Sequence, residues 1–123
     1  MPISILLIDD EDDYSETMRF WLMANGYNVR SASSGMDGLE EVKKERPDIV
    51  FLDMQMPDMN GIETLREIRR LYPDIPVIMV TACASDEMKR EATGIGISGF
   101  FSKGEDFKGA ARLISEVLRE IKR

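Results

Sequence analysis

The apolar run at residues 49–52 (Ile-Val-Phe-Leu) ends directly in a carboxylate, Asp53. Three of its four residues are β-branched or aromatic, which is typical of a strand covered on both faces by helices. Asp53 is then the first residue outside the core, at the strand end where open α/β sheets form ligand sites. The next segment, residues 56–61, is predicted to be a loop, because Pro57 fixes its own backbone and Asn60-Gly61 tolerates positive φ. The sequence therefore places a carboxylate on a stiff loop above a rigid sheet.

Short apolar runs alternate with segments of helical periodicity along the whole chain. Strands are predicted at residues 4–8, 27–30, 49–52, 76–80 and 99–102, and helices at residues 13–25, 36–45, 62–72, 86–93 and 107–121. This alternation is typical of βαβ units with right-handed crossovers, which build a parallel sheet with helices on both faces. At 123 residues the chain is long enough to bury one core, so a single α/β domain over residues 1–123 is expected.

The composition excludes several classes of function. The chain has 16 Lys and Arg against 23 Asp and Glu, and the resulting charge of −7 repels polyanions, so direct binding of nucleic acid is not expected. It has no histidine, which excludes histidine acid–base catalysis and any phosphohistidine of its own. A single cysteine, Cys83, excludes an internal disulfide, and no signal peptide or membrane-spanning run occurs. The cytoplasm is therefore the expected location.

Polar residues follow four of the five predicted strands, namely Asp9, Asp10, Asp53, Thr81 and Lys103. The ends of parallel strands meet at one edge of a sheet, so these side chains are expected to lie together. Three neighbouring carboxylates repel one another unless a cation lies among them, and Mg²⁺ accepts carboxylates while keeping sites for water or phosphate. The ammonium and the hydroxyl suit phosphoryl oxygens. The set predicts a phosphoryl-transfer site with Asp53 as nucleophile.

Each of these residues also has an ordinary structural explanation when it is taken alone. Asp53 and Thr81 could be turn or cap residues, Lys103 a solvated surface charge, and the acidic run 9–13 a complement to a helix dipole. Cys83 is expected to be an exposed residue at the rim. What favours the functional interpretation is the joint placement of three acids, a hydroxyl and an ammonium at one sheet edge.

These motifs resemble the receiver domain of two-component response regulators. The matching residues are Ile8-Asp9-Asp10-Glu11, Asp53-Met54-Gln55-Met56-Pro57 with Gly61, Thr81-Ala82, and Gly99-Phe100 with Lys103. They are spread over nearly the whole chain, and together they are highly specific. The resemblance implies a flavodoxin-like (CheY-like) fold, with a five-stranded parallel sheet in the order 2-1-3-4-5 and five helices on its two faces.

The resemblance also implies a role for each residue at the predicted site. Asp53 would be the phosphoacceptor, and Thr81 and Lys103 would bind the phosphoryl oxygens. Mg²⁺ would be held directly by Asp10, through water by Asp9, and by Asp53 and the backbone carbonyl of Gln55. Phe100 would act with Thr81 as the switch on the output face.

The same resemblance implies the partners of the chain. A sensor histidine kinase or a histidine phosphotransfer protein would donate the phosphoryl group in a phosphorelay, which fits a chain without histidine. Such partners approach receivers along the first helix, so Phe20 is a candidate contact. A downstream protein or an attached output domain would receive the signal, without contact to nucleic acid or membrane. Since no linker follows residue 118, the chain is expected to be a stand-alone regulator or a receiver cut from a longer protein.

Two positions depart from the family pattern. Gly104 follows Lys103, where the family usually has a proline, often across a cis bond. The Lys103–Gly104 bond is therefore expected to be trans, since a non-proline cis bond costs roughly 2.5–4 kcal/mol. Phe100 stands where tyrosine is also common, so the predicted switch would be steric, without a phenolic hydroxyl.

Three classes of function remain to be compared. A signalling switch would catalyse only its own phosphorylation and dephosphorylation. A phosphatase-type enzyme with an aspartyl-phosphate intermediate would need a second acid two residues after the nucleophile, where this chain has Gln55. A flavodoxin-like binding module would need a glycine- and hydroxyl-rich phosphate loop after the first strand, where residues 9–13 are all acidic. The sequence favours the phosphorylation-activated switch.

Overall fold

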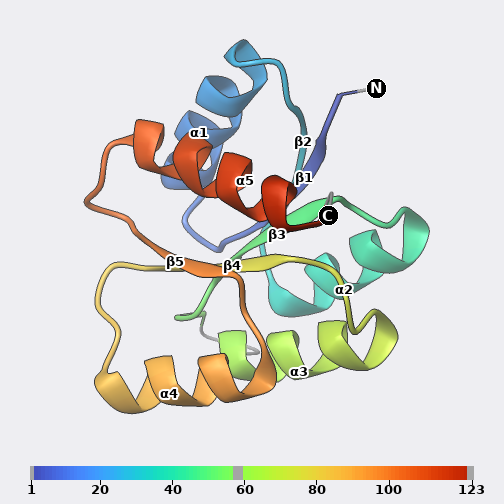
Figure 1. Cartoon of the computed structure of the whole chain (residues 1–123), viewed down its shortest axis with the longest axis vertical. Coiled ribbons are helices and arrows are strands. Elements are labelled where there is room, and N and C mark those ends of the chain that lie inside the picture. Colours follow the sequence, from blue (N-terminus) through green and yellow to red (C-terminus); the bar gives the residue numbers. More distant parts are fainter. Residues whose placement is uncertain (1, 57–59, 122–123) are drawn as a thin grey trace.

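Five parallel strands form one sheet in the order β2-β1-β3-β4-β5, which confirms the predicted fold (Figure 1). The computed structural model describes residues 2–56 and 60–121. Its strands are β1 (Ser4–Ile8), β2 (Asn28–Ala32), β3 (Ile49–Asp53), β4 (Val77–Thr81) and β5 (Gly99–Ser102). Its helices are α1 (Asp12–Ala24), α2 (Gly35–Lys44), α3 (Gly61–Leu71), α4 (Asp86–Ile95) and α5 (Phe107–Ile121). Residues 57–59 of the predicted loop, including Pro57, lie outside the described residues.

The helices form two layers, with α1 and α5 on one face of the sheet and α2, α3 and α4 on the other (Figure 1). Each layer encloses its own core because side chains along a strand alternate between faces. Phe51 of β3 packs toward α1 and α5, whereas Leu52 packs toward the other layer. All five residues of β3 are buried, as expected for a central parallel strand. The end of β3, where Asp53 lies, is therefore fixed between the two helical layers.

The largest error in the predicted elements concerns β2, which was expected at residues 27–30 and lies at Asn28–Ala32. Tyr27 belongs to the exit of α1, since its N–H donates to the carbonyl of Leu22 at 3.2 Å. Ser31 and Ala32 extend the strand by pairing with β1. An edge strand buries only part of its surface, so polar residues in it weaken the apolar pattern by which strands are predicted.

A side chain caps the first turn of α2, α3 and α4. Ser34, Asn60 and Ser85 accept hydrogen bonds from the backbone N–H three residues later, at 3.1, 2.9 and 3.1 Å. Each such bond satisfies one of the unpaired donors of the first helical turn. At its other end, α4 extends two residues beyond the predicted residue 93 and stops at Gly96, which has φ of +121°. The caps fix where each loop above the sheet edge ends.

The start of α3 packs directly against the end of β3 at Gly61. A Cβ atom at this position would lie 2.4 Å from Cα of Met54 and 2.8 Å from the carbonyl oxygen of Asp53. Both are backbone atoms, which cannot move aside cheaply. Gly61→Ala is therefore expected to lower the free energy of unfolding by about 1–3 kcal/mol, measured by urea denaturation.

Gly94, near the end of α4, provides the matched control for this substitution. A Cβ atom there would have no neighbour within 4 Å. Gly94→Ala is expected to leave stability unchanged or to raise it slightly, because alanine has the higher helix propensity. Equal destabilisation by both substitutions would contradict a steric origin.

Candidate functional site

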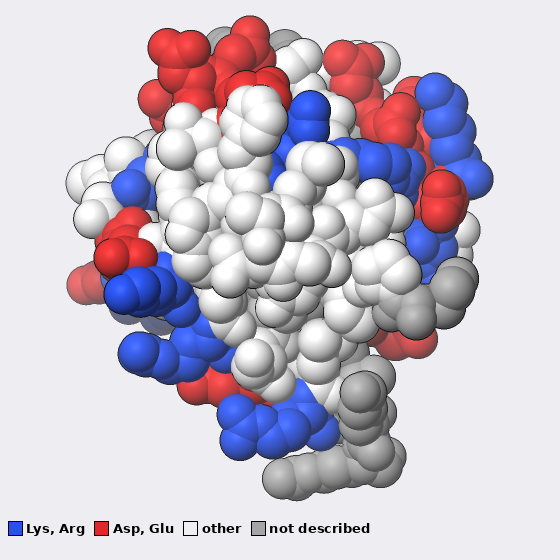
Figure 2. Space-filling model, turned by 90° about the horizontal axis from the view of Figure 1, so that it is seen from above, with Lys and Arg blue, Asp and Glu red and all other residues white. Residues whose placement is uncertain are grey.

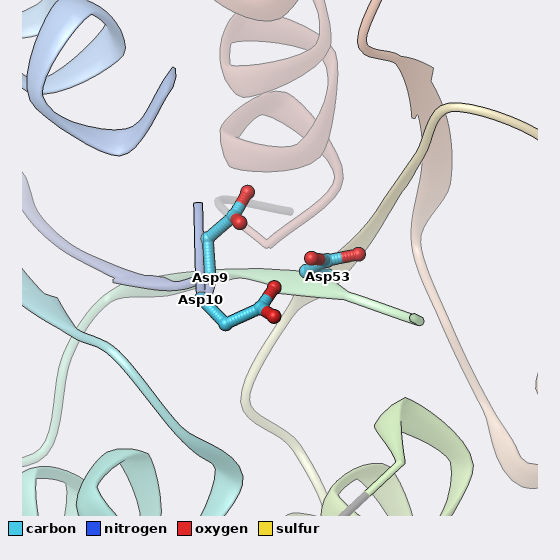
Figure 3. Close-up of side chains that lie close together, drawn as sticks. All are labelled: Asp9, Asp10 and Asp53. Carbon is cyan, nitrogen blue, oxygen red and sulfur yellow. The ribbon is translucent and has the colours of Figure 1, made fainter. Parts of the chain in front are cut away.

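The ends of β1 and β3 bring three carboxylates together. Asp9, Asp10 and Asp53 each place a carboxylate oxygen within 4.8 Å of the others (Figure 3). Asp9 and Asp53 are buried, with 6% and 2% of their surface exposed, while Asp10 is half-buried. The predicted acid cluster is therefore present, and two of its three members have lost most of their contact with water.

Local turns hold one oxygen of each buried carboxylate. Oδ1 of Asp9 accepts a hydrogen bond from the N–H of Glu11 at 2.8 Å, and Oδ1 of Asp53 accepts one from the N–H of Gln55 at 3.0 Å. Side chains that bond to the backbone two residues later form Asx-turns. Each turn leaves the second oxygen free to face the cluster.

Lys103 joins the cluster from the end of β5. Its Nζ lies 3.1 Å from Oδ2 of Asp9 and 3.4 Å from Oδ2 of Asp53, and it also contacts Oε1 of Glu11. Its backbone N–H donates to the carbonyl of Thr81 at 3.0 Å, which continues the pairing of β4 with β5. The Lys103–Gly104 bond is trans, as predicted, because the described residues contain no cis peptide bond.

Sequence reasoning gave no role at the site to two of the groups that surround this ammonium. Glu11 lies in the acidic run that opens the first helix, and Tyr14 lies in its apolar stripe, so both had ordinary explanations. In the structure, the ring centroid of Tyr14 is 5.0 Å from Nζ of Lys103. The ring and the Glu11 carboxylate thus direct the lysine in a chain that lacks the family's proline. The acidic run was the available signal, since an acid next to Asp10 was visible in it.

The environment shifts the pKa values of three of these groups. Burial raises the pKa of Asp53 to about 7, and the nearby Asp9 charge adds to it, against the Gln55 hydrogen bond and Lys103, which lower it. Burial opposes the charge on Lys103, but its hydrogen bonds to Glu11 and Asp9 outweigh this and raise its pKa. Burial also raises the pKa of Tyr14 to about 12. In the metal-free protein, burial therefore disfavours the ionised form of the Asp53 carboxylate.

In the metal-free protein, the free energy of unfolding is expected to fall as the pH rises through about 7. Asp53 has a pKa raised from 3.8 to about 7 in the folded state. Between these values only the folded state keeps the proton, so its stabilising effect is complete below the lower pKa and is lost as pH rises through the higher one.

Urea denaturation in EDTA at about pH 5 and about pH 8 measures this loss, which we expect to be on the order of 2 kcal/mol or more. The control is Asp53→Asn, which lacks the titrating group while keeping all the others. The change in the free energy of unfolding between the two pH values should therefore be larger in the parent than in the variant, by the amount that the ionisation of Asp53 contributes. An identical pH dependence in both proteins would contradict the raised pKa.

Thr81 and Phe100, the two residues of the predicted switch, lie on the neighbouring strands β4 and β5. Thr81 is buried at the end of β4, and its Oγ1 accepts a hydrogen bond from the N–H of Cys83 at 3.2 Å. The side chain of Phe100 is 40% exposed, with Nζ of Lys89 5.9 Å from its ring centroid. Both residues line a hollow of about 240 Å³. The ring is therefore in an outward position, beside a space that it could enter.

Gln55 links the two loops above β3 and β4. Its side chain is exposed, and its Nε2 donates to the carbonyl of Cys83 at 2.9 Å. The sequence prediction assigned only its backbone carbonyl to the site, and that assignment stays a prediction. Cys83 is exposed, as predicted.

The face formed by α1 and α5 has a largely uncharged middle and charged side chains around its rim (Figure 2). Phe20 and Met23 of α1 are 62% and 46% exposed, so the predicted partner contact at Phe20 is accessible. Within residues 2–56 and 60–121, no helix has the length and apolar character needed to cross a membrane.

Comparison with known proteins identifies the class to which this fold and site belong. The family model of the response regulator receiver domain matches residues 5–115. Transcriptional regulatory protein ZraR of Escherichia coli (strain K12) is 37% identical over 116 residues, which are 94% of this chain and 26% of that protein. Response regulator MprA of Mycobacterium sp. (strain KMS) is 30% identical over 122 residues, which are 99% of this chain and 50% of that protein.

Among solved structures, a CheY-like response regulator receiver domain protein from Methanospirillum hungatei JF-1 superimposes with a TM-score of 0.94. It is 28% identical, and the match covers 98% of this chain and 96% of that one. The chain therefore belongs to the response regulator receiver domain family. It spans about a quarter of ZraR and half of MprA.

Proposed function

We propose that this receiver domain works as a switch in which Asp53 accepts a phosphoryl group from a phosphohistidine of a sensor histidine kinase or a histidine phosphotransfer protein. The observation that carries the proposal is the position of Asp53, buried within 4.8 Å of two further carboxylates and with Nζ of Lys103 at 3.4 Å. An Asp53 carboxylate oxygen attacks phosphorus, the phosphorus–nitrogen bond breaks, and its electron pair returns to the imidazole. The products are an acyl phosphate and a neutral histidine.

The donor set suits Mg²⁺. Three carboxylates face one another with Lys103 as their only cationic partner among the described residues, so the cluster carries excess negative charge. Hard oxygen ligands of this kind favour Mg²⁺, which would neutralise charge on the incoming phosphoryl group. By the family resemblance, Asp10 and Asp53 would bind it directly, with the carbonyl of Gln55, and Asp9 would bind it through water.

The remaining groups complete the site by positioning the phosphoryl oxygens. The Lys103 ammonium lies beside the Asp53 oxygen that faces the cluster and would bind one phosphoryl oxygen. The Thr81 hydroxyl, at the neighbouring strand end, would bind another. The chain is not expected to turn over a metabolite, because Gln55 cannot serve as a second general acid.

The signal would pass to a downstream protein or to an attached output domain. This follows from the family, and it is supported by the fact that the chain spans only part of ZraR and MprA. A cytoplasmic location and the absence of direct nucleic-acid contact belong to the same proposal, and the charge of −7 supports the latter.

The proposal is tested by incubation with acetyl phosphate, with and without Mg²⁺, followed by intact-mass spectrometry. A switch adds one phosphoryl group per chain, and only when Mg²⁺ is present. A phosphatase-type enzyme would instead release inorganic phosphate over many turnovers while staying largely unmodified. Equal phosphorylation with and without Mg²⁺ would contradict the proposal, and so would sustained release of inorganic phosphate.

Mg²⁺ is expected to raise the melting temperature of the unphosphorylated protein. A ligand that binds only the folded state adds stability, by about 2.7 kcal/mol at a concentration one hundred times its Kd. The gain should vanish in Asp10→Ala and persist in Asp12→Ala, which removes an exposed acid from the first turn of α1. Equal shifts in both variants, measured by thermal denaturation, would place the metal elsewhere.

A further inference from the structure

A groove runs between α3 and α4, and none of the predicted site residues lines it. These helices lie next to each other on one face of the sheet (Figure 1). Two hollows of about 440 and 590 Å³ run between them, and they share Arg66 and Glu91 in their linings. They therefore form one continuous groove along the two helices.

One end of this groove is strongly basic. Four arginines from the two helices line it, namely Arg66, Arg69, Arg70 and Arg90. Glu91 is the one acidic residue in this lining among the described residues. The chain as a whole has a charge of −7, so this concentration of positive charge runs against its composition. Like charges that face one hollow repel one another.

Two of these arginines have acidic partners, and two do not. Arg66 pairs with Glu91 at 3.1 Å, and Arg70 pairs with Glu67. The half-buried Arg69 donates only to neutral backbone carbonyls, including that of Gly96 at 2.9 Å. In the described part of the chain, neither Arg69 nor Arg90 lies within ion-pair distance of a carboxylate.

The helix dipoles account for two of these arginines but not for Arg90. Arg69 and Arg70 lie in the last turn of α3, where a cation is favourable. Arg90, however, lies in the middle of α4. Arg69 is held against the chain that ends α4 through the carbonyl of Gly96. Within residues 2–56 and 60–121 neither arginine forms an ion pair, although the charge of Asp74 acts on Arg69 from a greater distance.

The other end of the groove has the opposite charge. It lies toward the starts of α3 and α4 and is lined by Glu63 and Glu87, with apolar surface from Met54, Ile62 and Met88. The exposed Arg66–Glu91 pair marks the middle, and exposed pairs of this kind contribute little stability. The groove is thus polarised along its length, with a central ion pair that can open at low cost.

We propose that this groove is a docking site for a segment of a partner protein whose charges complement it. Acidic side chains of the segment would lie on Arg69, Arg70 and Arg90, and a basic side chain would lie between Glu63 and Glu87. The 11 residues of α3 span about 16 Å, enough for about five residues of extended chain. A nucleic acid does not fit this pattern, because its uniform negative charge would be repelled at the acidic end.

The test uses two fluorescent peptides of the same composition, one with its glutamates at one end and its lysines at the other, and one with the charges interleaved. We expect the segregated peptide to bind about tenfold more tightly by fluorescence anisotropy. We also expect it to shift the NMR signals of α3 and α4. Equal affinities for the two peptides would overturn the proposal, as would shifts confined to other elements.

The protein variant is Arg70→Glu with Arg90→Glu, which inverts two exposed groove charges. Its matched control is Lys108→Glu with Arg112→Glu, which makes the same change in net charge at exposed positions of α5. We expect the groove variant to lose about tenfold in affinity and the control to keep its affinity within about twofold. Equal losses would show an effect of net charge alone and overturn the proposal.

Two further probes distinguish other ligands. Pyrophosphate and a wholly acidic peptide should both bind more weakly than the segregated peptide, since neither engages the acidic end. If either binds as tightly, the groove is a general anion site and the proposal fails. Labelling by acetyl phosphate should be the same in the groove variant and the parent, so a failure of docking is separable from a failure of the switch.

Discussion

Replacing Asp53 with asparagine is expected to abolish phosphorylation by acetyl phosphate. The substitution keeps the size of the side chain and removes the anionic oxygen that attacks phosphorus. Because Oδ1 of Asp53 accepts from the N–H of Gln55, an asparagine can keep this hydrogen bond through its own carbonyl oxygen. The variant should therefore fold normally and show no added phosphoryl group by intact-mass spectrometry.

The control for this substitution is Asp12→Asn, which removes an exposed acid close in sequence to the cluster. It should be labelled to the same extent as the parent, because it lies outside the set of converging carboxylates. Full labelling of Asp53→Asn would assign the phosphoacceptor to another residue. Loss of labelling in both variants would point to a general effect of charge rather than to a nucleophile.

The position of Asp53 could be predicted from sequence because a short local pattern, an apolar run followed by a carboxylate, determines it. A buried central strand is a continuous apolar run, and the residue that ends it lies at the sheet edge. The same reasoning predicted Asp9, Thr81 and Lys103 at three other strand ends. The edge strand β2 was predicted less well, since Ser31 is exposed and shows no such pattern.

The surroundings of Lys103 were not predictable in this way. Its ammonium contacts Glu11, 92 residues away in sequence, and lies over the ring of Tyr14. Both residues come from the start of α1, where an acid and an aromatic residue have sufficient explanations in the helix dipole and the core. Which side chains reach the lysine depends on where the first turn of α1 lies relative to the end of β5, and no local pattern encodes that distance.

Thr81→Ala is expected to uncouple Phe100 from phosphorylation. In the unphosphorylated structure the Thr81 hydroxyl is engaged by the N–H of Cys83, in the loop after β4. A phosphoryl group on Asp53 would draw the Thr81 hydroxyl away from the N–H of Cys83. The loop after β4 would then lose this hydrogen bond and be free to move. The ring of Phe100 could then leave Lys89 and enter the hollow that both switch residues line.

The size of this response is limited by the contacts that the phosphoryl group gains. It can shift the equilibrium only by its differential interaction with the two states, and one or two hydrogen bonds to a charged group contribute roughly 1.5–3 kcal/mol each. The parent is therefore expected to switch incompletely without a partner. In Thr81→Ala one of these bonds is missing, so most of the bias toward the inward ring should be lost.

The measurement compares free and beryllofluoride-bound forms by NMR, in the parent and in Thr81→Ala. Signals of Phe100, the loop after β4 and the start of α4 should shift in the parent and remain nearly unchanged in the variant, even though both bind beryllofluoride. Thr93→Ala is the matched control, because the Thr93 hydroxyl is exposed and donates only to the carbonyl of Lys89 within α4. It should respond like the parent. If Phe100 responds fully in Thr81→Ala, the ring is moved by a route other than the threonine hydroxyl, such as the Lys103 backbone that joins β5 to β4 at the carbonyl of Thr81.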